Sequence, residues 1–244
     1  MSMASPRLSI IVPCYNEADN LPTLFDAFRA VVAGHPDVEV VLVNNGSKDR
    51  SAEVFAELLA WPEHGFVRLV NVPVNQGYGF GILSGLRAAR GEYLAWTHAD
   101  LQTDPKDVLL GFARMLDESQ PERCFLRGRR IGRPLFDRLF TAGMSGIASL
   151  ALRSKLYDIN AQPKIFHRDL LDQMTDAPHD FSLDLFTLHL ANKQGLKILE
   201  QPVHFGERHA GEAKGGGSLR GKYKLTRRTF AFILELRRKL FAVR

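Results

Sequence analysis

The first half of the chain alternates short apolar runs with longer segments in which apolar residues recur every three or four positions. The short runs have the length of strands that are buried on both faces, and the longer segments have the spacing of amphipathic helices. This alternation predicts an α/β fold, with a mostly parallel sheet that carries helices on both faces. We expect strands at residues 8–12, 38–43, 66–72 and 93–97, and helices at 18–32, 47–59, 78–90 and 104–116.

The second half has a less regular pattern, and two of its segments differ in composition from the rest. Residues 206–217 are rich in glycine and charge, and we expect a loop there that closes over a bound ligand. Residues 219–244 hold nine Lys or Arg and one Glu, a charge of +8, whereas the whole chain carries +5, so residues 1–218 sum to −3. We interpret residues 1–218 as one domain and the remainder as a basic helix. Further helices are expected at 135–152, 183–193 and 225–243, and a strand at 196–203.

The basic tail carries apolar residues such as Phe230, Ile233 and Phe241 at helical spacing. An amphipathic helix with a basic side suits an anionic membrane surface. The alternative is a helix packed on the protein body with its charges in solvent. No nucleic-acid recognition motif accompanies the tail, so we expect no nucleic-acid partner. Because the chain has no run of eighteen apolar residues, no signal-peptide layout and only two cysteines, we expect a cytoplasmic protein or one at the inner face of the cell membrane.

Polar residues gather where four of the expected strands meet the next helix. They occupy residues 13–17, 44–49, 75–81 and 98–100. Each stretch alone reads equally well as a turn with helix caps, and the glycines of 75–81 do not have the spacing of the dinucleotide fingerprint. Since ligands bind beyond the carboxyl ends of parallel strands, the coincidence of four such stretches predicts a binding site at one edge of the sheet.

These stretches resemble glycosyltransferase family 2, whose members have the Rossmann-like GT-A fold. The later half of the chain is similar to the branch that contains dolichyl- and polyprenyl-phosphate sugar transferases. The stretches that match the family are residues 12–17, 43–49, 75–77, 91–93 and 99–102, and those that match the branch are 128–130, 158–164 and 208–214.

The resemblance implies a hexosyltransferase that uses a UDP- or GDP-linked nucleotide sugar, a divalent cation and a single inverting displacement. The implied acceptor is polyprenyl phosphate at the cytoplasmic face of a membrane, in the synthesis of cell-envelope glycans. Two alternatives stay open: a hydroxyl of a saccharide or lipid-linked glycan as acceptor, and a catalytically degenerate protein that only binds a sugar nucleotide. The residues implied to contact the donor are Pro13, Tyr15, Glu17, Asn45, Gly77, His98 and Asp100.

The chain departs from the family pattern at two places in the implied donor site. His98 stands where the family's Asp-x-Asp motif has its first aspartate, and Asn45 stands where an aspartate is usual. We interpret Asp100 as the main ligand of Mn²⁺ or Mg²⁺ and as a catalytic residue, with Gln102 beside it. Because Mn²⁺ also accepts imidazole, His98 could ligate the metal. It could instead donate a hydrogen bond to a phosphate oxygen or a sugar hydroxyl.

The acceptor side depends on the chemistry of the nucleophile. A hydroxyl needs a carboxylate as general base, whereas a lipid phosphate is already ionised and needs cations that steer it. Asp158 matches the position of an acidic residue near the acceptor, and we interpret it as the second catalytic residue; Asp184 and Asp180 are alternative bases, although Asp180 also suits a helix cap. The residues expected to contact phosphate are Arg130, Lys164, Arg208 and Lys214.

Overall fold

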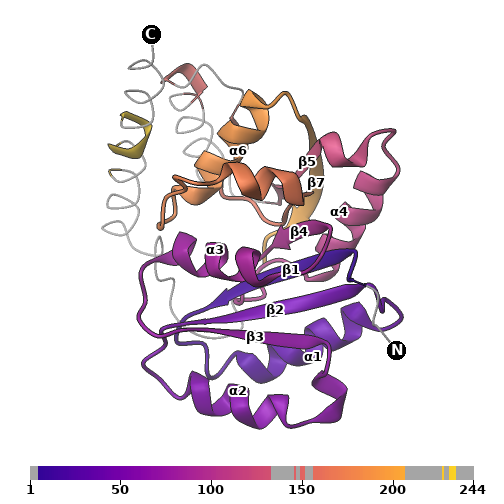
Figure 1. Cartoon of the computed structure of the whole chain (residues 1–244), viewed down its shortest axis with the longest axis vertical. Coiled ribbons are helices and arrows are strands. Elements are labelled where there is room, and N and C mark those ends of the chain that lie inside the picture. The colour runs from indigo at the N-terminus through magenta and orange to yellow at the C-terminus, as the bar shows by residue number, and fades with distance from the viewer. Residues whose placement is uncertain are drawn as a thin grey trace.

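Seven strands form one sheet in the computed structural model, in the order β3-β2-β1-β4-β6-β5-β7 (Figure 1). The structure describes residues 5–132, 146, 149–151, 156–206, 227 and 231–234. Of the strands, β6 alone runs antiparallel to its neighbours, β4 and β5. The strands are β1 Leu8–Cys14, β2 Val38–Asn45, β3 Val67–Val72, β4 Tyr93–Trp96, β5 Cys124–Ile131, β6 Lys164–His167 and β7 Lys197–His204.

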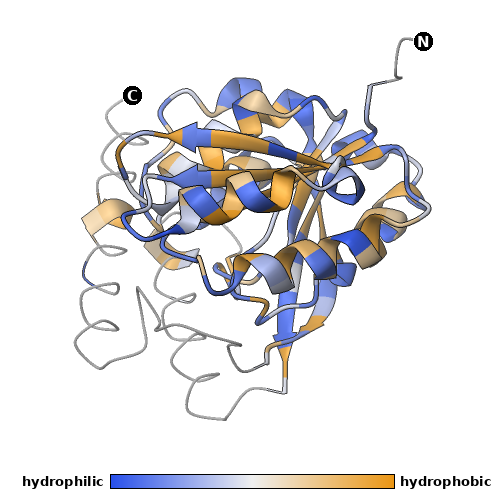
Figure 2. Ribbon diagram, turned by 90° about the horizontal axis from the view of Figure 1, so that it is seen from below, coloured by the Kyte–Doolittle hydropathy of each residue, from blue (hydrophilic) through white to orange (hydrophobic). Residues whose placement is uncertain are grey.

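Helices cover both faces of the sheet, and each face has its own apolar core. Figure 2 shows the helices carrying both hydrophobic and hydrophilic stretches, as expected for elements with one buried side. On β2, Val41 and Val43 point to one core, whereas Val40 and Leu42 point to the other. The cluster with Val41 includes residues of α3 Tyr78–Ala88 and α6 Leu183–Lys193. The cluster with Val40 includes residues of α1 Leu21–Val32, α2 Ser51–Leu59 and α4 Lys106–Leu116.

The α/β fold is confirmed, and the elements expected in the first half lie within a few residues of their predicted bounds. The helix predicted at 183–193 is α6 without a shift, and the strand predicted at 196–203 is β7. The prediction omitted two strands: β5, which has eight residues, and β6, which has four and begins with a fully buried lysine, Lys164. It also omitted the short 3₁₀ helices η1 Pro62–His64, η2 Pro121–Arg123 and η3 Arg168–Gln173.

Most of the remaining sequence predictions fall outside the described residues. Of the helix predicted at 135–152, residues 146 and 149–151 are described and helical, and the loop 206–217 is described only at Gly206. In the predicted tail helix, Ile233 is 2 % exposed and belongs to the core cluster beneath α6. This residue of the proposed membrane face therefore packs on the protein body. Within the described residues, no helix combines the length and the apolar character needed to cross a bilayer.

Helix α3 packs closely on the sheet at Gly85. A Cβ atom at Gly85 would lie 2.5 Å from Cγ2 of Ile11 and 2.8 Å from Cγ2 of Val43. Both neighbours are β-branched and fully buried, so neither can rotate away cheaply. Gly111 of α4 is a milder case, because its Cβ would meet the side-chain ends of Leu126 and Ile165 at 3.0 and 3.2 Å.

We expect Gly85→Ala to lower the free energy of unfolding by about 1–3 kcal/mol, the usual cost of an overpacked core. Gly111→Ala makes the same change of helix propensity, a gain of at most about 1 kcal/mol, against side chains that can yield. We expect Gly111→Ala to leave the stability within about 1 kcal/mol of the parent protein. Urea unfolding followed by circular dichroism compares the two, and equal stabilities for both variants would contradict the packing argument.

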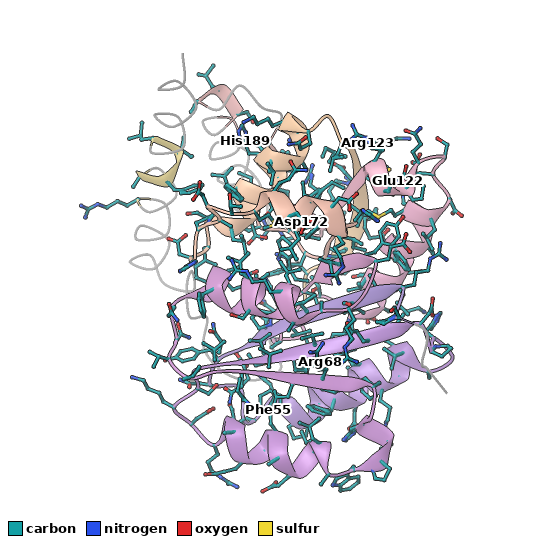
Figure 3. All side chains as sticks on the ribbon, in the orientation of Figure 1. Phe55, Arg68, Glu122, Arg123, Asp172 and His189 are labelled. Carbon is teal, nitrogen blue, oxygen red and sulfur yellow. The ribbon has the colours of Figure 1, made fainter. Side chains whose placement is uncertain are left out.

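His189 lies on α6, on the opposite side of the sheet from Phe55 of α2 (Figure 3). The residue is 8 % exposed, and neither ring nitrogen has a hydrogen-bond partner in the described part of the chain. Burial, with a smaller contribution from the charge of Lys193, lowers the pKa of His189 below its usual 6.5. As the pH falls below 6.5, the unfolded chain therefore takes up a proton before the folded protein does.

We expect the wild type to lose stability between pH 6.5 and pH 5.0, and His189→Gln to lose less. The difference is at most about 2 kcal/mol, because each pH unit over which only the unfolded chain gains one proton costs about 1.4 kcal/mol. Urea unfolding at several pH values gives the slopes. His35→Gln, at an exposed position, is the matched control and should follow the wild type; a His189→Gln slope equal to that of the wild type would contradict the argument.

Candidate functional site

The loops that follow β1 and β2 are joined by four hydrogen bonds. Asn16 donates from its backbone to Oγ of Ser47 at 3.1 Å, and its own Oδ1 accepts from the backbone of Lys48 at 2.8 Å. Two further backbone amides, of Glu17 and Ala18, donate to Oγ of Ser51 at 3.1 Å and to Oδ2 of Asp49 at 3.2 Å. Since β1 pairs in parallel with β2, the two loops leave the sheet at the same edge. Pro13, Tyr15 and Glu17, predicted to meet the nucleoside, are all half-buried in this region.

Asn45 joins the end of β2 to the segment before α3. Its amide donates from Nδ2 to the carbonyl of Gly77 at 3.0 Å, and its backbone carbonyl accepts from the Asn75 side chain at 2.9 Å. The side chain is 2 % exposed, and its Oδ1 has no hydrogen-bond partner in the described part of the chain. Gly81 gives the amide its space, because a Cβ there would lie 2.6 Å from Nδ2.

The glycine-containing segment before α3 packs against another stretch of backbone. A Cβ atom at Gly77, where φ is +118°, would lie 2.3 Å from the carbonyl oxygen of His179, and one at Gly79 would lie 2.5 Å from that of Pro178. The same His179 carbonyl accepts a hydrogen bond from the backbone of Phe80 at 3.0 Å. The structure thus gives Gly77, predicted to contact the donor, a packing role at the start of α3.

Asp100 follows β4 at the edge where β1 and β2 also end. The residue is 6 % exposed, and its carboxylate accepts from the backbone of Gln102 at 3.2 Å. Leu101 between them has φ +53°, a conformation that is uncommon outside glycine and often found at functional sites. Gln102 makes two hydrogen bonds with the backbone of Gly206. Its side-chain Nε2 donates to the Gly206 carbonyl at 3.1 Å, and its backbone carbonyl accepts from the Gly206 amide at 2.8 Å. Gln102 therefore fastens the start of the loop predicted at 206–217.

His98 is half-buried, and its Nε2 lies 3.2 Å from the hydroxyl oxygen of Tyr78. Burial lowers the pKa of His98, although the negative charges of Asp100 and Asp184 oppose that effect. The Tyr78 ring stacks on Phe181 at 4.6 Å between centroids. Burial, with the charges of Asp184 and Asp100, raises the pKa of Tyr78 well above its usual 10.0, so the hydroxyl keeps its proton at neutral pH.

A buried polar chain continues from Tyr78 to Lys164. Gln162 donates from Nε2 to the Tyr78 oxygen at 3.4 Å and to Oδ1 of Asp184 at 2.8 Å. Lys164 is 0 % exposed, and its ammonium donates to the same Asp184 oxygen at 2.8 Å. The carbonyls of Ile159 and Ala161 accept its other two hydrogen bonds, at 2.7 and 3.1 Å.

These contacts correct the role predicted for Lys164. All three of its N–H bonds are used inside the protein, and the side chain has no exposed surface. A phosphate in contact with this ammonium would have to replace a buried ion pair, at a cost of about 3–5 kcal/mol for the partner left behind. The same pairing occupies Asp184, which the sequence offered as an alternative base.

Asp158 and Arg130 form a second ion pair on this side of the site. The Asp158 carboxylate is held through Oδ2 by the backbone amide of Arg130 at 2.8 Å and through Oδ1 by its Nε at 2.8 Å. The side chain of Asp158 is 5 % exposed, and its backbone has φ +42°. Gly128 permits this arrangement, because a Cβ there would lie 2.0 Å from the carbonyl oxygen of Gln162. The two predicted acceptor residues thus lie together, with their charges directed at each other.

The other basic residues of β5 also have an acidic partner. Arg127 and Arg129 both contact the carboxylate of Glu200 on β7. Arg208 and Lys214, predicted to contact phosphate, lie outside the described residues. Asp180, the remaining alternative base, accepts from the backbone of Ser182 at 2.9 Å, and Ser182, not Asp180, is the N-cap residue of α6.

The donor atoms near Asp100 fit a divalent cation that a ligand helps to hold. Among the described residues, no three His, Cys, Asp or Glu side chains gather closely enough to enclose a metal. A single carboxylate at a strand end is nevertheless enough for a cation that completes its coordination with phosphate oxygens and water. Asp100 supplies that carboxylate, and its oxygen chemistry suits Mn²⁺ or Mg²⁺.

Sequence reasoning missed Tyr78 and Gln162, which connect the donor residues to the acceptor residues. The available signal for Tyr78 was its position at the first turn of a helix that leaves the same edge of the sheet as His98. Gln162 gave no such signal, because its partners Tyr78 and Asp184 lie 84 and 22 residues away.

Comparison with known proteins places the chain in a family. A family model described as glycosyl transferase family 2 matches residues 9–138, which is 130 of the 244 residues. An undecaprenyl-phosphate 4-deoxy-4-formamido-L-arabinose transferase of Photorhabdus laumondii is 25 % identical over 213 residues, and the match covers 85 % of this chain and 62 % of that protein. A dolichyl-phosphate beta-glucosyltransferase of Trichomonas vaginalis is 28 % identical over 231 residues, covering 89 % and 71 %. The chain thus spans less than two thirds of the length of the bacterial relative.

Solved structures share the fold. A mannosyltransferase of Pyrobaculum calidifontis, in complex with GDP-Man and Mn²⁺, superposes with a TM-score of 0.62 at 24 % identity, covering 88 % of this chain and 59 % of that one. Glucosyl-3-phosphoglycerate synthase of Mycobacterium tuberculosis, with Mn²⁺, UDP and glucosyl-3-phosphoglycerate, superposes with a TM-score of 0.69 at 18 % identity, covering 95 % and 80 %. These likenesses show the shared fold.

Two adjacent asparagines allow a matched test of the site. Asn45→Asp turns the donor that faces the Gly77 carbonyl into an acceptor, so we expect a loss of about 1–3 kcal/mol of stability at pH 8, the cost of an unmade buried hydrogen bond. Asn44→Asp keeps the oxygen that accepts from the Ser47 backbone, so we expect a loss below about 1 kcal/mol. Urea unfolding measures both, and equal losses would show that the Asn45 amide does not hold these loops together.

Proposed function

The chain belongs to glycosyl transferase family 2, and from this membership we propose that it moves a sugar from a UDP- or GDP-linked donor to polyprenyl phosphate in one inverting displacement. The observation that carries the proposal is that β1, β2 and β4 end at one edge of the sheet, where Asp100 lies at the same edge as Asn45 and His98. Asn45 and His98 are connected there through the neighbouring residues Gly77 and Tyr78. The names of the two relatives, both transferases acting on polyprenyl phosphates, support this acceptor class.

On the donor side, the nucleoside lies against the loop of Pro13, Tyr15 and Glu17. Its base lies near the end of β2, where the buried Asn45 supports the wall of the site through its hydrogen bond to Gly77. The diphosphate lies toward Asp100. A divalent cation held there would neutralise the charge that develops on the departing diphosphate. The Asp100 carboxylate is oriented by the backbone of Gln102, so it need not be ordered when a ligand arrives.

The acceptor class is supported by the pairing of the carboxylates. Asp158 is engaged by Arg130, Asp184 by Lys164, and Asp180 by the backbone before α6. A hydroxyl nucleophile needs a base that can accept its proton, and each of these carboxylates already holds a donor. A phosphate monoester is ionised at neutral pH and needs no base, so this set of residues suits it better.

The bonds then change in one step. An oxygen of the lipid phosphate attacks the anomeric carbon of the donor sugar. The bond from that carbon to the diphosphate oxygen breaks, and the nucleoside diphosphate leaves with the electron pair. No proton is transferred from the nucleophile, and the configuration at the anomeric carbon inverts.

Release of nucleoside diphosphate tests the proposal. We expect release from one UDP- or GDP-sugar of a panel, in the presence of Mn²⁺ or Mg²⁺, to depend on added polyprenyl phosphate. Asp100→Asn keeps the acceptor for the Gln102 backbone but removes the charge, and we expect activity to fall about 100-fold or more, since charge stabilisation by a cation is worth several kcal/mol. Asp172→Asn, an exposed residue of η3, is the control and should retain full activity.

Three outcomes would count against the proposal. Release that requires a saccharide in place of the lipid phosphate would identify a hydroxyl acceptor. Binding of a nucleotide sugar without release, under every acceptor tried, would identify a protein that only binds. Full activity of Asp100→Asn would remove the metal-linked role of this carboxylate.

A further inference from the structure

The hydroxyl of Tyr78 lies between an imidazole and an amide. Its oxygen is 3.2 Å from Nε2 of His98 and 3.4 Å from Nε2 of Gln162. A tyrosine hydroxyl donates one hydrogen bond and can accept others, whereas a neutral imidazole has one donating and one accepting nitrogen. The direction of the contact with His98 therefore depends on what Gln162 offers.

The orientation of the Gln162 amide is fixed by Asp184. The atom of Gln162 that lies 2.8 Å from Oδ1 of Asp184 must be a donor, because the same oxygen also accepts from the Lys164 ammonium and belongs to an ionised carboxylate. That atom is Nε2, and it is also the atom that faces the Tyr78 oxygen. Gln162 therefore donates toward Tyr78 and cannot accept its proton.

His98 is then the acceptor left for the Tyr78 proton within the described residues. Tyr78 is half-buried, and a hydroxyl that donates to nothing would forfeit a hydrogen bond. We propose that Tyr78 holds His98 in the tautomer with the proton on Nδ1, so that His98 donates a hydrogen bond to an oxygen of the bound nucleotide sugar and does not ligate the metal.

The contacts of the ring support both parts of this assignment. Nε2 carries the lone pair, but the Tyr78 hydroxyl occupies it. Within the described part of the chain, Nδ1 of His98 has no protein hydrogen-bond partner. This atom is not fully buried, so it is open to solvent. The ring thus presents an N–H group outward, and its ligand is an oxygen of a phosphate or of a sugar hydroxyl.

The identity of the ligand rests on the proposed function. The tautomer of His98 does not depend on it. It decides between the two roles that the sequence left open for His98. Asp100 would then be the one side chain of the His98-Ala99-Asp100 motif that holds the cation. Tyr78 acts as a positioning residue, since it reaches the ligand only through the imidazole.

Two-bond ¹H–¹⁵N correlation spectra of the ¹⁵N-histidine-labelled full chain, without ligand and at pH 8, read the tautomer directly. We expect His98, assigned by the signals lost in His98→Gln, to show the pattern of a ring protonated on Nδ1. In Tyr78→Phe, which keeps the stacked ring but loses the hydroxyl, we expect the two nitrogen shifts to move toward each other as the tautomers exchange. A wild-type ring protonated on Nε2, or a pattern unchanged in Tyr78→Phe, would overturn the proposal.

Tyr93→Phe is the matched control, because Tyr93 lies on β4, the strand that precedes His98, but packs in the other core cluster. It should leave the His98 signals unchanged. A second measurement needs no variant at Tyr78: electron spin echo modulation of Mn²⁺, in the presence of whichever of UDP and GDP binds, detects a directly bonded ¹⁵N nucleus. We expect no such coupling from His98, and finding one would overturn the proposal.

The two proposals fail in different ways. If neither UDP nor GDP binds with Mn²⁺, or no sugar is transferred, the proposed function fails while the ligand-free spectra still decide the tautomer. If transfer occurs but the ring is protonated on Nε2, the assignment of Tyr78 and His98 fails and the proposed function stands.

Discussion

One buried ammonium organises the acceptor half of the site. Lys164 begins β6, where it pairs with the last residue of β4 on one side and with Arg127 of β5 on the other. Its three hydrogen bonds gather the chain just before it and the first turn of α6. Because an unpaired charge in this position would be very costly, the segment that carries Asp158 and Gln162 has little freedom to lie elsewhere. The contacts of Arg130, Tyr78 and His98 all build on that segment.

The antiparallel direction of β6 explains why this segment reaches the site at all. In a parallel strand, the residues that follow the strand lie at the carboxyl edge. In β6 the residues that precede it lie there, next to the end of β4. The donor loops and the acceptor segment therefore meet at one edge, although they come from opposite ends of their strands.

Hydrophobic periodicity and the polar residues at strand ends predicted the helices and strands of the first hundred residues well, because both signals are local. The runs that became β1, β2 and β4 are apolar and flanked by polar turns, so the edge of the sheet followed from the order of elements. Lys164 could not be read in this way, since a lysine is normally a surface residue and its burial depends on Asp184, twenty residues later. The same holds for Tyr78, whose role depends on its contacts with His98 and Gln162. Residues that act through distant partners have no local pattern to reveal them.

The hydrogen bonds between the loops after β1 and β2 are made by the chain itself, from Asn16, Ser47 and their neighbours. Most of the conformational entropy that these loops lose on becoming ordered is therefore lost during folding. A nucleotide that binds beside them meets walls already in place, and so loses less of its binding free energy to chain ordering. Preorganisation of this kind favours fast exchange of donor and product, because neither has to wait for the loops to assemble.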